Sequence, residues 1–186
     1  MIGYCFCGSF CTFKESFEVL KRLKNTYNDI IPIMSYNAYS TNTRFGDSKD
    51  WVDKIEALCE RRIINTIKDA EPLGPKIPLD ALVISPCTGN TLAKLANGIT
   101  DTPVCMAAKA HLRSDRPLIV ALASNDAMSA NLSNISTLLS RKNIYFVPMK
   151  QDDPINKPHS LVADFSLVED TLSSAIAGKQ IRKLFI

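Results

Sequence analysis

Small polar residues follow four apolar runs of the sequence, at the points where those runs end. The polar segments are 8–12 (GSFCT), 35–37 (SYN), 86–91 (PCTGNT) and 124–126 (SND). Hydroxyl and amide groups at a strand end can bind an anion. A helix that begins there adds free backbone N–H groups and a favourable dipole. These segments therefore predict a site for an anionic ligand.

The first segment is the most informative of the four. Gly8 allows a sharp turn, and Ser9 offers a hydroxyl at a predicted helix start, where Thr12 and Glu15 match a T-x-x-E capping box. The turn is neither G-x-G-x-x-G nor a P-loop, so it predicts neither a dinucleotide nor a triphosphate. A phosphomonoester joined to an aromatic group fits it better. Thr12 and Asn90 also have a simpler interpretation, as helix N-caps.

Five other residues are candidates for chemistry, each with a plainer alternative. Cys87 could be a nucleophile near the N-terminus of a predicted helix, where thiol pKa values fall. No histidine is near in sequence, so a plain small residue is favoured. Asp152 and Asp153 could form an acid–base pair, although a turn is favoured. His159 is interpreted as a surface or supporting residue. Arg44 could hold a carboxylate bidentately, or be a solvated loop charge.

Metal binding is not expected from the six cysteines and two histidines. Cys5 and Cys7 alternate along a predicted strand and should share one face of it. No CxxC pair is present, and the histidines are far from the cysteines. Reduced core cysteines in a cytoplasmic protein are the favoured interpretation.

Composition predicts one globular domain over residues 1–186. Hydrophobic residues make up 46% and charged residues 22% of the chain, which is ordinary for such a domain. A net charge of +3 from scattered basic residues argues against nucleic acid as a partner. No apolar stretch approaches the roughly 20 residues of a membrane helix, and the N-terminus reads as a strand, not a signal peptide.

Strand-like and helix-like runs alternate along the chain. Strands are predicted at 2–7, 30–35, 81–85, 118–123 and 144–147, and helices from residue 13, at 51–67, 91–96, 130–139 and 167–177. Pro32 places the second strand near an edge. This order predicts an α/β fold, a three-layer Rossmann-like or flavodoxin-like parallel sheet with helices on both faces. Ligands of such sheets bind beyond the carboxyl ends of the strands, where the strand order reverses.

A family resemblance is carried by GSFCTFK at 8–14, Ser35 with Ala38, and PCTGNTLAKLANGITD at 86–101. These motifs resemble those of the flavin-dependent cysteine decarboxylase superfamily. The resemblance implies FMN bound between subunits of a homo-oligomer, a trimer or a multiple of three. It implies Asn90 as a substrate-side and catalytic residue. The FMN-binding residues that it implies are Gly8, Ser9, Phe10, Ser35, Pro86, Thr88, Ser124 and Asn125.

Further segments resemble the dipicolinate synthase branch of that superfamily. They are STNTRFGDSKDWVDKIE (40–56), EPLGPKIPLD (71–80) and VPMKQDDPINKPHSLVADF (147–165). The resemblance implies oxidation of a dihydrodipicolinate-level intermediate to pyridine-2,6-dicarboxylate during sporulation, in the mother-cell cytoplasm of a spore-forming bacterium. The implied partner is a separate A subunit, of Rossmann type, which binds NADP or NAD. Arg44 and Asn90 are the candidate contacts for the dicarboxylate, and Lys94 is expected to pair with an acidic neighbour or face solvent.

Two departures from the superfamily pattern bear on the reaction. Residues 71–80 contain no histidine, and ALASNDAMSAN (121–131) stands in place of a P-x-M-N-x-x-M-W stretch. Both argue against decarboxylation. An oxidising enzyme subunit is the first hypothesis. A decarboxylase-like enzyme and a non-catalytic activating scaffold of the same fold are the alternatives.

Overall fold

The computed structural model describes residues 1–181 and 183–186, and a parallel sheet forms its centre. Five strands run parallel in the order β2-β1-β3-β4-β5. They are β1 (Ile2–Phe6), β2 (Ile30–Met34), β3 (Ala81–Cys87), β4 (Leu118–Ser124) and β5 (Ile144–Phe146). The predicted flavodoxin-like α/β fold is confirmed. The strand order reverses between β1 and β3, and β2 with Pro32 is the outermost named strand on its side.

Two short strands make the sheet mixed, although the sequence predicts a purely parallel one. β7 (Leu161–Ala163) pairs antiparallel with the end of β4, and β6 (Met149–Lys150) pairs antiparallel with β7. Residues 151–160 form the loop that joins them. Strands of two and three residues are too short to show an alternating pattern, so no sequence signal indicates this hairpin.

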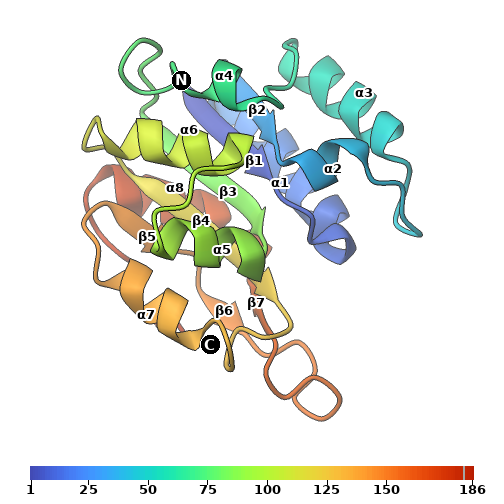
Figure 1. The fold of residues 1–186 in the computed structure, drawn as a ribbon, viewed down its shortest axis with the longest axis vertical. Coiled ribbons are helices and arrows are strands. Elements are labelled where there is room, and N and C mark those ends of the chain that lie inside the picture. Colours follow the sequence, from blue (N-terminus) through green and yellow to red (C-terminus); the bar gives the residue numbers. More distant parts are fainter. Residues whose placement is uncertain (182) are drawn as a thin grey trace.

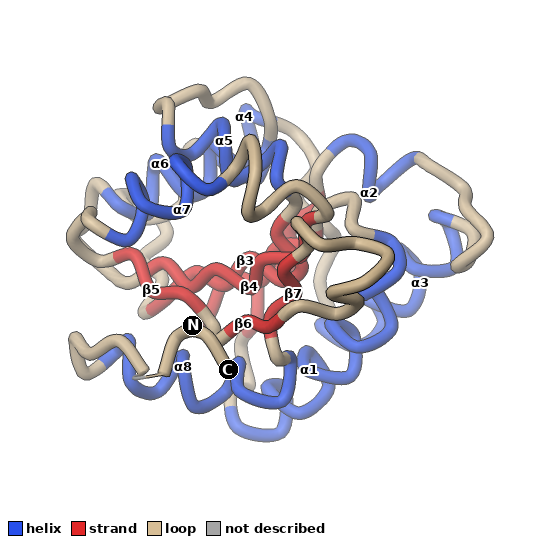
Figure 2. The backbone as a smooth tube through the Cα atoms, turned by 90° about the horizontal axis from the view of Figure 1, so that it is seen from below, coloured by secondary structure: helices blue, strands red, loops and turns tan. Residues whose placement is uncertain are grey.

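Helices cover both faces of the sheet, as Figure 2 shows. One face carries α4 (Ile67–Ala70), α5 (Gly89–Ala96), α6 (Pro103–Leu112) and α7 (Leu132–Leu139). The other face carries α1 (Phe13–Thr26), α3 (Ser48–Cys59) and α8 (Val168–Ile176), and the short α2 (Tyr36–Ser40) follows β2. Within the described residues, no helix is long and apolar enough to cross a membrane.

Alternation along the central strands sorts side chains between the two helical layers. In β1, Ile2, Tyr4 and Phe6 pack with α1, α3 and α8. Cys5 and Cys7 point to the opposite face and pack with α5 and α6. The prediction that these two cysteines share one face is confirmed, and both are fully buried in an apolar core.

One predicted helix ends too late and one helix was not predicted, each for a local reason. The helix expected over 51–67 is α3 and stops at Cys59, because Glu60 adopts a left-handed conformation. The buried Ile63 suggested a longer helix, but the chain there returns to β2 through a bridge between Ile33 and Ile64. Helix α6 was not predicted, because its ten residues are apolar almost all round and show no helical stripe.

The predicted helix caps also need correction. A turn of 3-10 helix (Phe10–Thr12) precedes α1, and the Thr12 hydroxyl donates to the Ser9 carbonyl oxygen at 3.0 Å instead of capping α1. The capping box is therefore wrong. Asn90 is not an N-cap either, because α5 begins one residue before it and is capped by Thr88.

Candidate functional site

A polar cleft of about 450 Å³ lies at the carboxyl ends of β1 and β3, where the strand order reverses. Helix α2 follows β2 and helix α5 follows β3 (Figure 1), and residues at the start of both helices line this cleft. We call it the strand-end cleft. Its lining residues are Gly8, Ser35, Tyr36, Asn37, Thr88, Asn90, Thr91, Lys94, Asp101 and Thr102.

One wall of the cleft is the first turn of α5. The Thr88 hydroxyl accepts a hydrogen bond from the Thr91 backbone N–H at 3.1 Å and donates to the Thr91 hydroxyl at 3.1 Å. The Thr91 hydroxyl in turn donates to the Cys7 thiol at 3.4 Å, and the Cys7 N–H donates to the Pro86 carbonyl oxygen at 3.1 Å. This chain of bonds ties the start of α5 to the end of β1. Asn90 lies in the same turn, exposed toward the cleft.

The opposite wall is the start of α2. The Ser35 side chain caps this helix by accepting from the Ala38 N–H at 3.3 Å, and the Ser35 N–H donates to the Phe6 carbonyl oxygen at 3.0 Å. The Tyr36 side chain beside it is 45% exposed. This wall therefore offers an aromatic ring together with hydroxyl and amide groups.

Gly8 lies between the two walls, and a side chain there would face Phe10 and Asn37. An added Cβ would lie 3.5 Å from the Phe10 ring and 3.6 Å from the Asn37 Cβ, which are ordinary contacts, and Gly8 has no positive φ. Ser9 and Phe10 follow Gly8 without lining the cleft. Ser9 starts the 3-10 turn, and Phe10 stacks on Phe13 with ring centroids 5.7 Å apart.

The end of β4 supports α5 from behind. An added Cβ on Gly89 would lie 2.4 Å from the Ser124 hydroxyl and 2.6 Å from the Asn131 amide nitrogen, so any larger residue would displace these side chains. Ser124 donates to the Asp126 carboxylate and, with Asn131, holds the pKa of Asp126 below its ordinary value. Ser124 and the neighbouring Asn125 are not cleft-lining residues. Sequence reasoning missed the role of Gly89.

Lys94 and Asp101 bring the charges of the cleft together. The Lys94 ammonium lies 2.7 and 2.8 Å from the two carboxylate oxygens of Asp101. The hydrogen bond from Lys94 holds the pKa of Asp101 below its ordinary value. The expected acidic partner of Lys94 is thus identified, and the two lining charges cancel.

Other candidates lie outside the cleft lining. Arg44 lies in the exposed loop before α3, where its guanidinium stacks over the Phe45 ring at 4.8 Å. Cys87 is fully buried in the apolar core, and burial raises the pKa of its thiol well above the ordinary value. A buried neutral thiol is not a nucleophile, so the alternative of a small core residue is confirmed.

The acidic pair and His159 lie in the loop between β6 and β7. Asp152 pairs with Lys157 at 2.9 Å, and Asp153 accepts from the Asn156 N–H at 3.0 Å, so both carboxylates serve the turn. His159 is exposed in the same loop. His111 is buried in α6, with its Nε2 2.9 Å from the Pro117 carbonyl oxygen. Neither histidine lines the strand-end cleft.

The composition of the cleft fits a phosphorylated aromatic ligand. Its volume falls within the roughly 300–1,000 Å³ usual for ligand pockets. Ser35, Thr88 and Thr102 offer hydroxyls, Asn37 and Asn90 offer amides, and the Tyr36 ring offers an aromatic face. Among the residues described, no three histidine, cysteine or acidic side chains are grouped to hold a metal ion.

Sequence comparison gives two consistent matches. The profile of the Flavoprotein family matches residues 1–175. The dipicolinate synthase B subunit of Bacillus subtilis (strain 168) is 45% identical over 185 residues, which cover 100% of this chain and 92% of the relative.

Structural comparison extends these matches. The crystal structure of the dipicolinate synthase B subunit from Bacillus halodurans superposes with a TM-score of 0.91 at 41% identity, covering 100% of this chain and 95% of that one. The Burkholderia xenovorans protein DmrB, in complex with FMN and described as a cubic protein cage for redox transfer, gives a TM-score of 0.70 at 17% identity. The superposition covers 95% of this chain and 94% of the DmrB chain. At that identity it shows a common fold.

Proposed function

Because this chain belongs to the Flavoprotein family, on its dipicolinate synthase branch, we propose that it is the FMN-binding B subunit of a dipicolinate synthase. It acts as one domain with a nicotinamide-dependent A subunit, which binds NADP or NAD. The pair oxidises a dihydrodipicolinate-level intermediate to dipicolinate in the mother-cell cytoplasm during sporulation. The single observation that carries this proposal is the donor-rich cleft at the point where the strand order reverses.

In this proposal the phosphate of FMN is held by donors at the ends of β1, β2 and β3. Gly8, Ser9 and Ser35 supply backbone and hydroxyl donors, and Thr88 borders the flavin from the start of α5. Phe10 and Pro86 shape this region, while Ser124 and Asn125 act through the turn that abuts Gly89. FMN, when bound, supplies hydride-accepting chemistry to the site. The side chains of this cleft bind and orient.

The substrate carries two carboxylates, which must be paired with donors when they leave water. Asn90 faces the cleft and is our candidate for orienting one of them, both as a substrate contact and as a catalytic residue. Arg44, from the loop before α3, is the candidate for the other. Lys94 already has a carboxylate partner in Asp101, so it serves to fix the wall of the cleft.

FMN binding is the first test. Purified protein incubated with excess FMN and then desalted should keep flavin absorbance. Ser9→Asp and Ser35→Asp should remove it, because each places a negative charge where the phosphate is held. Ser133→Asp, which adds the same charge on the exposed face of α7, is the matched control and should keep the flavin. Wild-type protein that retains no flavin would refute the proposal.

Substrate use is the second test, in an assay reconstituted with the nicotinamide-dependent A subunit. Arg44→Ala and Asn90→Ala should each lower dipicolinate formation at limiting substrate while FMN content stays intact. Unchanged activity in both variants would place the carboxylate contacts on the partner protein. Release of carbon dioxide in place of dipicolinate would favour the decarboxylase-like alternative. Activation of the A subunit without flavin would favour a scaffold.

We further propose a homo-oligomer, trimeric or a multiple of three. The strand-end cleft is open on one side, and a neighbouring chain would complete it. A protein of the same fold is described as a cubic cage, which supports an assembled state. Light scattering at micromolar concentration should give at least three times the monomer mass of 20.6 kDa, and a monomer would contradict this.

A further inference from the structure

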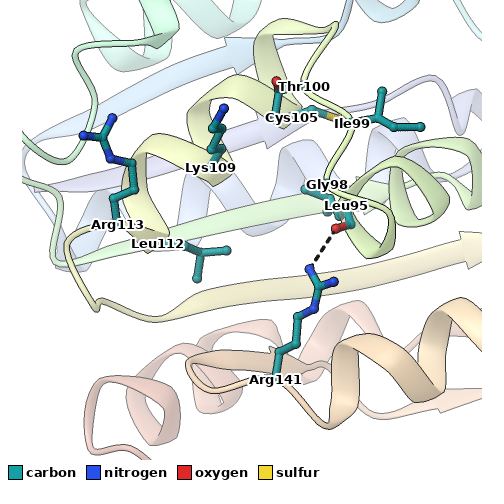
Figure 3. Close-up of a pocket in the computed structure, with 9 residues that line it drawn as sticks. All are labelled: Leu95, Gly98, Ile99, Thr100, Cys105, Lys109, Leu112, Arg113 and Arg141. Carbon is teal, nitrogen blue, oxygen red and sulfur yellow. Dashed lines mark hydrogen bonds between the residues drawn. The ribbon is translucent and has the colours of Figure 1, made fainter.

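A second pocket lies between the end of α5, the length of α6 and the end of α7. It encloses about 360 Å³ and is bounded by three apolar residues, Leu95, Ile99 and Leu112, and three cations, Lys109, Arg113 and Arg141 (Figure 3). We call it the basic pocket. None of its lining residues is acidic.

The floor of the basic pocket is apolar and partly open to water. Ile99 is 47% exposed, Leu95 and Leu112 are half-buried, and the Cys105 thiol behind them is buried. Apolar surface in a concave site is stabilised when a ligand covers it. A flat apolar body of ring size would cover this floor.

The three cations have no counter-charge in the part of the chain that the structure describes. Lys109, in the last turn of α6, and Arg113, the residue that caps its C-terminus, lie one turn apart. Their like charges repel, and neither pairs with a carboxylate. The Arg141 guanidinium is fixed by donating to the Leu95 and Ala96 carbonyl oxygens at 3.1 and 2.7 Å. Helix C-termini favour single cations, but that preference does not explain an apolar floor between three of them.

The basic pocket and the strand-end cleft share a wall, formed by the end of α5 and the loop 97–102. Residues that are adjacent in sequence line different sites at two points of this wall. Lys94 and Asp101 line the cleft, whereas Leu95 and Thr100 line the basic pocket. The Lys94–Asp101 ion pair spans this wall at 2.7 Å. A ligand that moves Leu95 or Thr100 therefore acts on the two charged residues of the cleft.

We propose that the basic pocket binds a small dianion, a flat apolar ring that carries two carboxylates, and that its occupation changes the affinity of the strand-end cleft for its own ligand. Carboxylates pair with the two cations of α6 and with Arg141, while the ring covers Leu95, Ile99 and Leu112. Binding itself does not depend on FMN. The interpretation that the bound dianion is the reaction product, and that it regulates the enzyme by feedback, rests on the proposed function.

The binding test uses full-length, FMN-free protein and pyridine-2,6-dicarboxylate as the probe, followed by calorimetry. Wild-type protein should show saturable binding, and the double variant Lys109→Gln/Arg113→Gln should bind at least tenfold more weakly. Lys142→Gln removes an exposed cation next to Arg141 that pairs with Asp115 outside the pocket, and it should bind like wild type. Circular dichroism should show all variants folded.

Three results would overturn the proposal. One is a double variant that binds like wild type, and another is an equal loss in Lys142→Gln, which would indicate general charge attraction. The third is competition by inorganic phosphate at equal concentration, because the site would then recognise charge without the ring. Loss of binding in Asn90→Ala with normal binding in the double variant would place the probe in the strand-end cleft and also count against the basic pocket.

Coupling between the sites is measured separately, as FMN affinity with and without saturating dicarboxylate. We expect a change of at least threefold in wild type and none in the double variant. An unchanged FMN affinity in wild type would refute the coupling. If the protein binds no FMN at all, the proposed function fails, yet the calorimetric result still decides whether the basic pocket binds the dianion.

Discussion

The strand-end cleft and the basic pocket share one wall but satisfy their polar groups in opposite ways. In the cleft, Thr88 caps α5, Ser35 caps α2, and Lys94 pairs with Asp101. In the basic pocket, the cations of α6 have no carboxylate partner within the described chain. The first site is therefore built before its ligand arrives, and the second retains charge that an anion can neutralise.

The largest expected effect breaks the support of the cleft. Gly89→Ala would place a Cβ 2.4 Å from the Ser124 hydroxyl and 2.6 Å from the Asn131 amide. The side chains of Ser124 and Asn131 must then move and give up their hydrogen bonds, and we expect a loss of roughly 1–3 kcal/mol in the free energy of unfolding, as for overpacked sites. Urea denaturation measures this loss, and flavin retention should fall with it.

Gly178→Ala is the control for this substitution. Gly178 has a φ of +74° and no atom near an added Cβ, so it tests backbone strain alone, at the end of α8. It should cost stability without changing flavin retention. If Gly89→Ala unfolds like wild type and keeps its flavin, the turn after β4 does not position α5.

The sequence predicts those features of the cleft that depend on local residue patterns, but not those that depend on long-range contacts. β1, β3 and β4 were predicted because each is a continuous apolar run. A buried strand ends where the side chains become polar. The polar residues after these strands therefore indicated from sequence where the cleft lies. Gly89 and Ser124 are 35 positions apart in sequence, and their contact depends on how two neighbouring strands end.

The basic pocket could not be predicted for a related reason. Its cations come from α6 and from the end of α7, and α6 itself shows no periodic pattern. In sequence Lys109, Arg113 and Arg141 look like scattered surface charges. Only the packing of α5 against α6 and α7 brings them around one apolar floor. Long-range packing, not residue type, was the missing information.

A smaller loss of stability is expected from removing the N-cap of α5, at the wall of the strand-end cleft. Thr88→Ala loses the hydrogen bond from the Thr91 N–H, which should cost about 1 kcal/mol of unfolding free energy. Thr88→Ser keeps the hydroxyl and should recover most of that loss. Urea midpoints of the two variants make the comparison. Equal destabilisation by alanine and serine would mean that the Thr88 methyl group matters more than the cap.

Mild acid should destabilise the fold through the buried His111 of α6, while the ion pair of the strand-end cleft stays charged. Burial lowers the pKa of His111, which is buried in α6 and lines neither site, and its Nδ1 has no partner among the described residues. The folded state thus favours neutral His111, and this contribution is present above the unfolded pKa of about 6.5 and is lost as pH falls below it. Asp101, whose pKa is lowered by Lys94, stays ionised there.

The measurement is the urea midpoint at pH 7.5 and at pH 5.5. Wild type should be less stable at the lower pH, because the unfolded state binds a proton at His111 more readily than the folded state does. His111→Gln keeps a donor for the Pro117 carbonyl oxygen and should show a flatter pH profile, although it lowers stability at both values. A variant with the same pH slope as wild type would assign the slope to another group.

The smallest expected effect on stability comes from a substitution that makes the strand-end cleft resemble the basic pocket. Asp101→Asn leaves Lys94 without its carboxylate, so the cleft acquires an unpaired cation like those of the basic pocket. Because the pair is at the surface, the urea midpoint should match that of wild type. Affinity for an anionic ligand should instead rise a few-fold at low salt, and added salt should abolish the gain. Lys49→Gln, which breaks an exposed pair on α3 remote from both sites, should change neither quantity. If Asp101→Asn weakens the binding of anions, pairing does not restrain the charge of Lys94. Asp101 would then hold the lysine in the position where it meets the ligand, and the cleft would need its ion pair to bind at all.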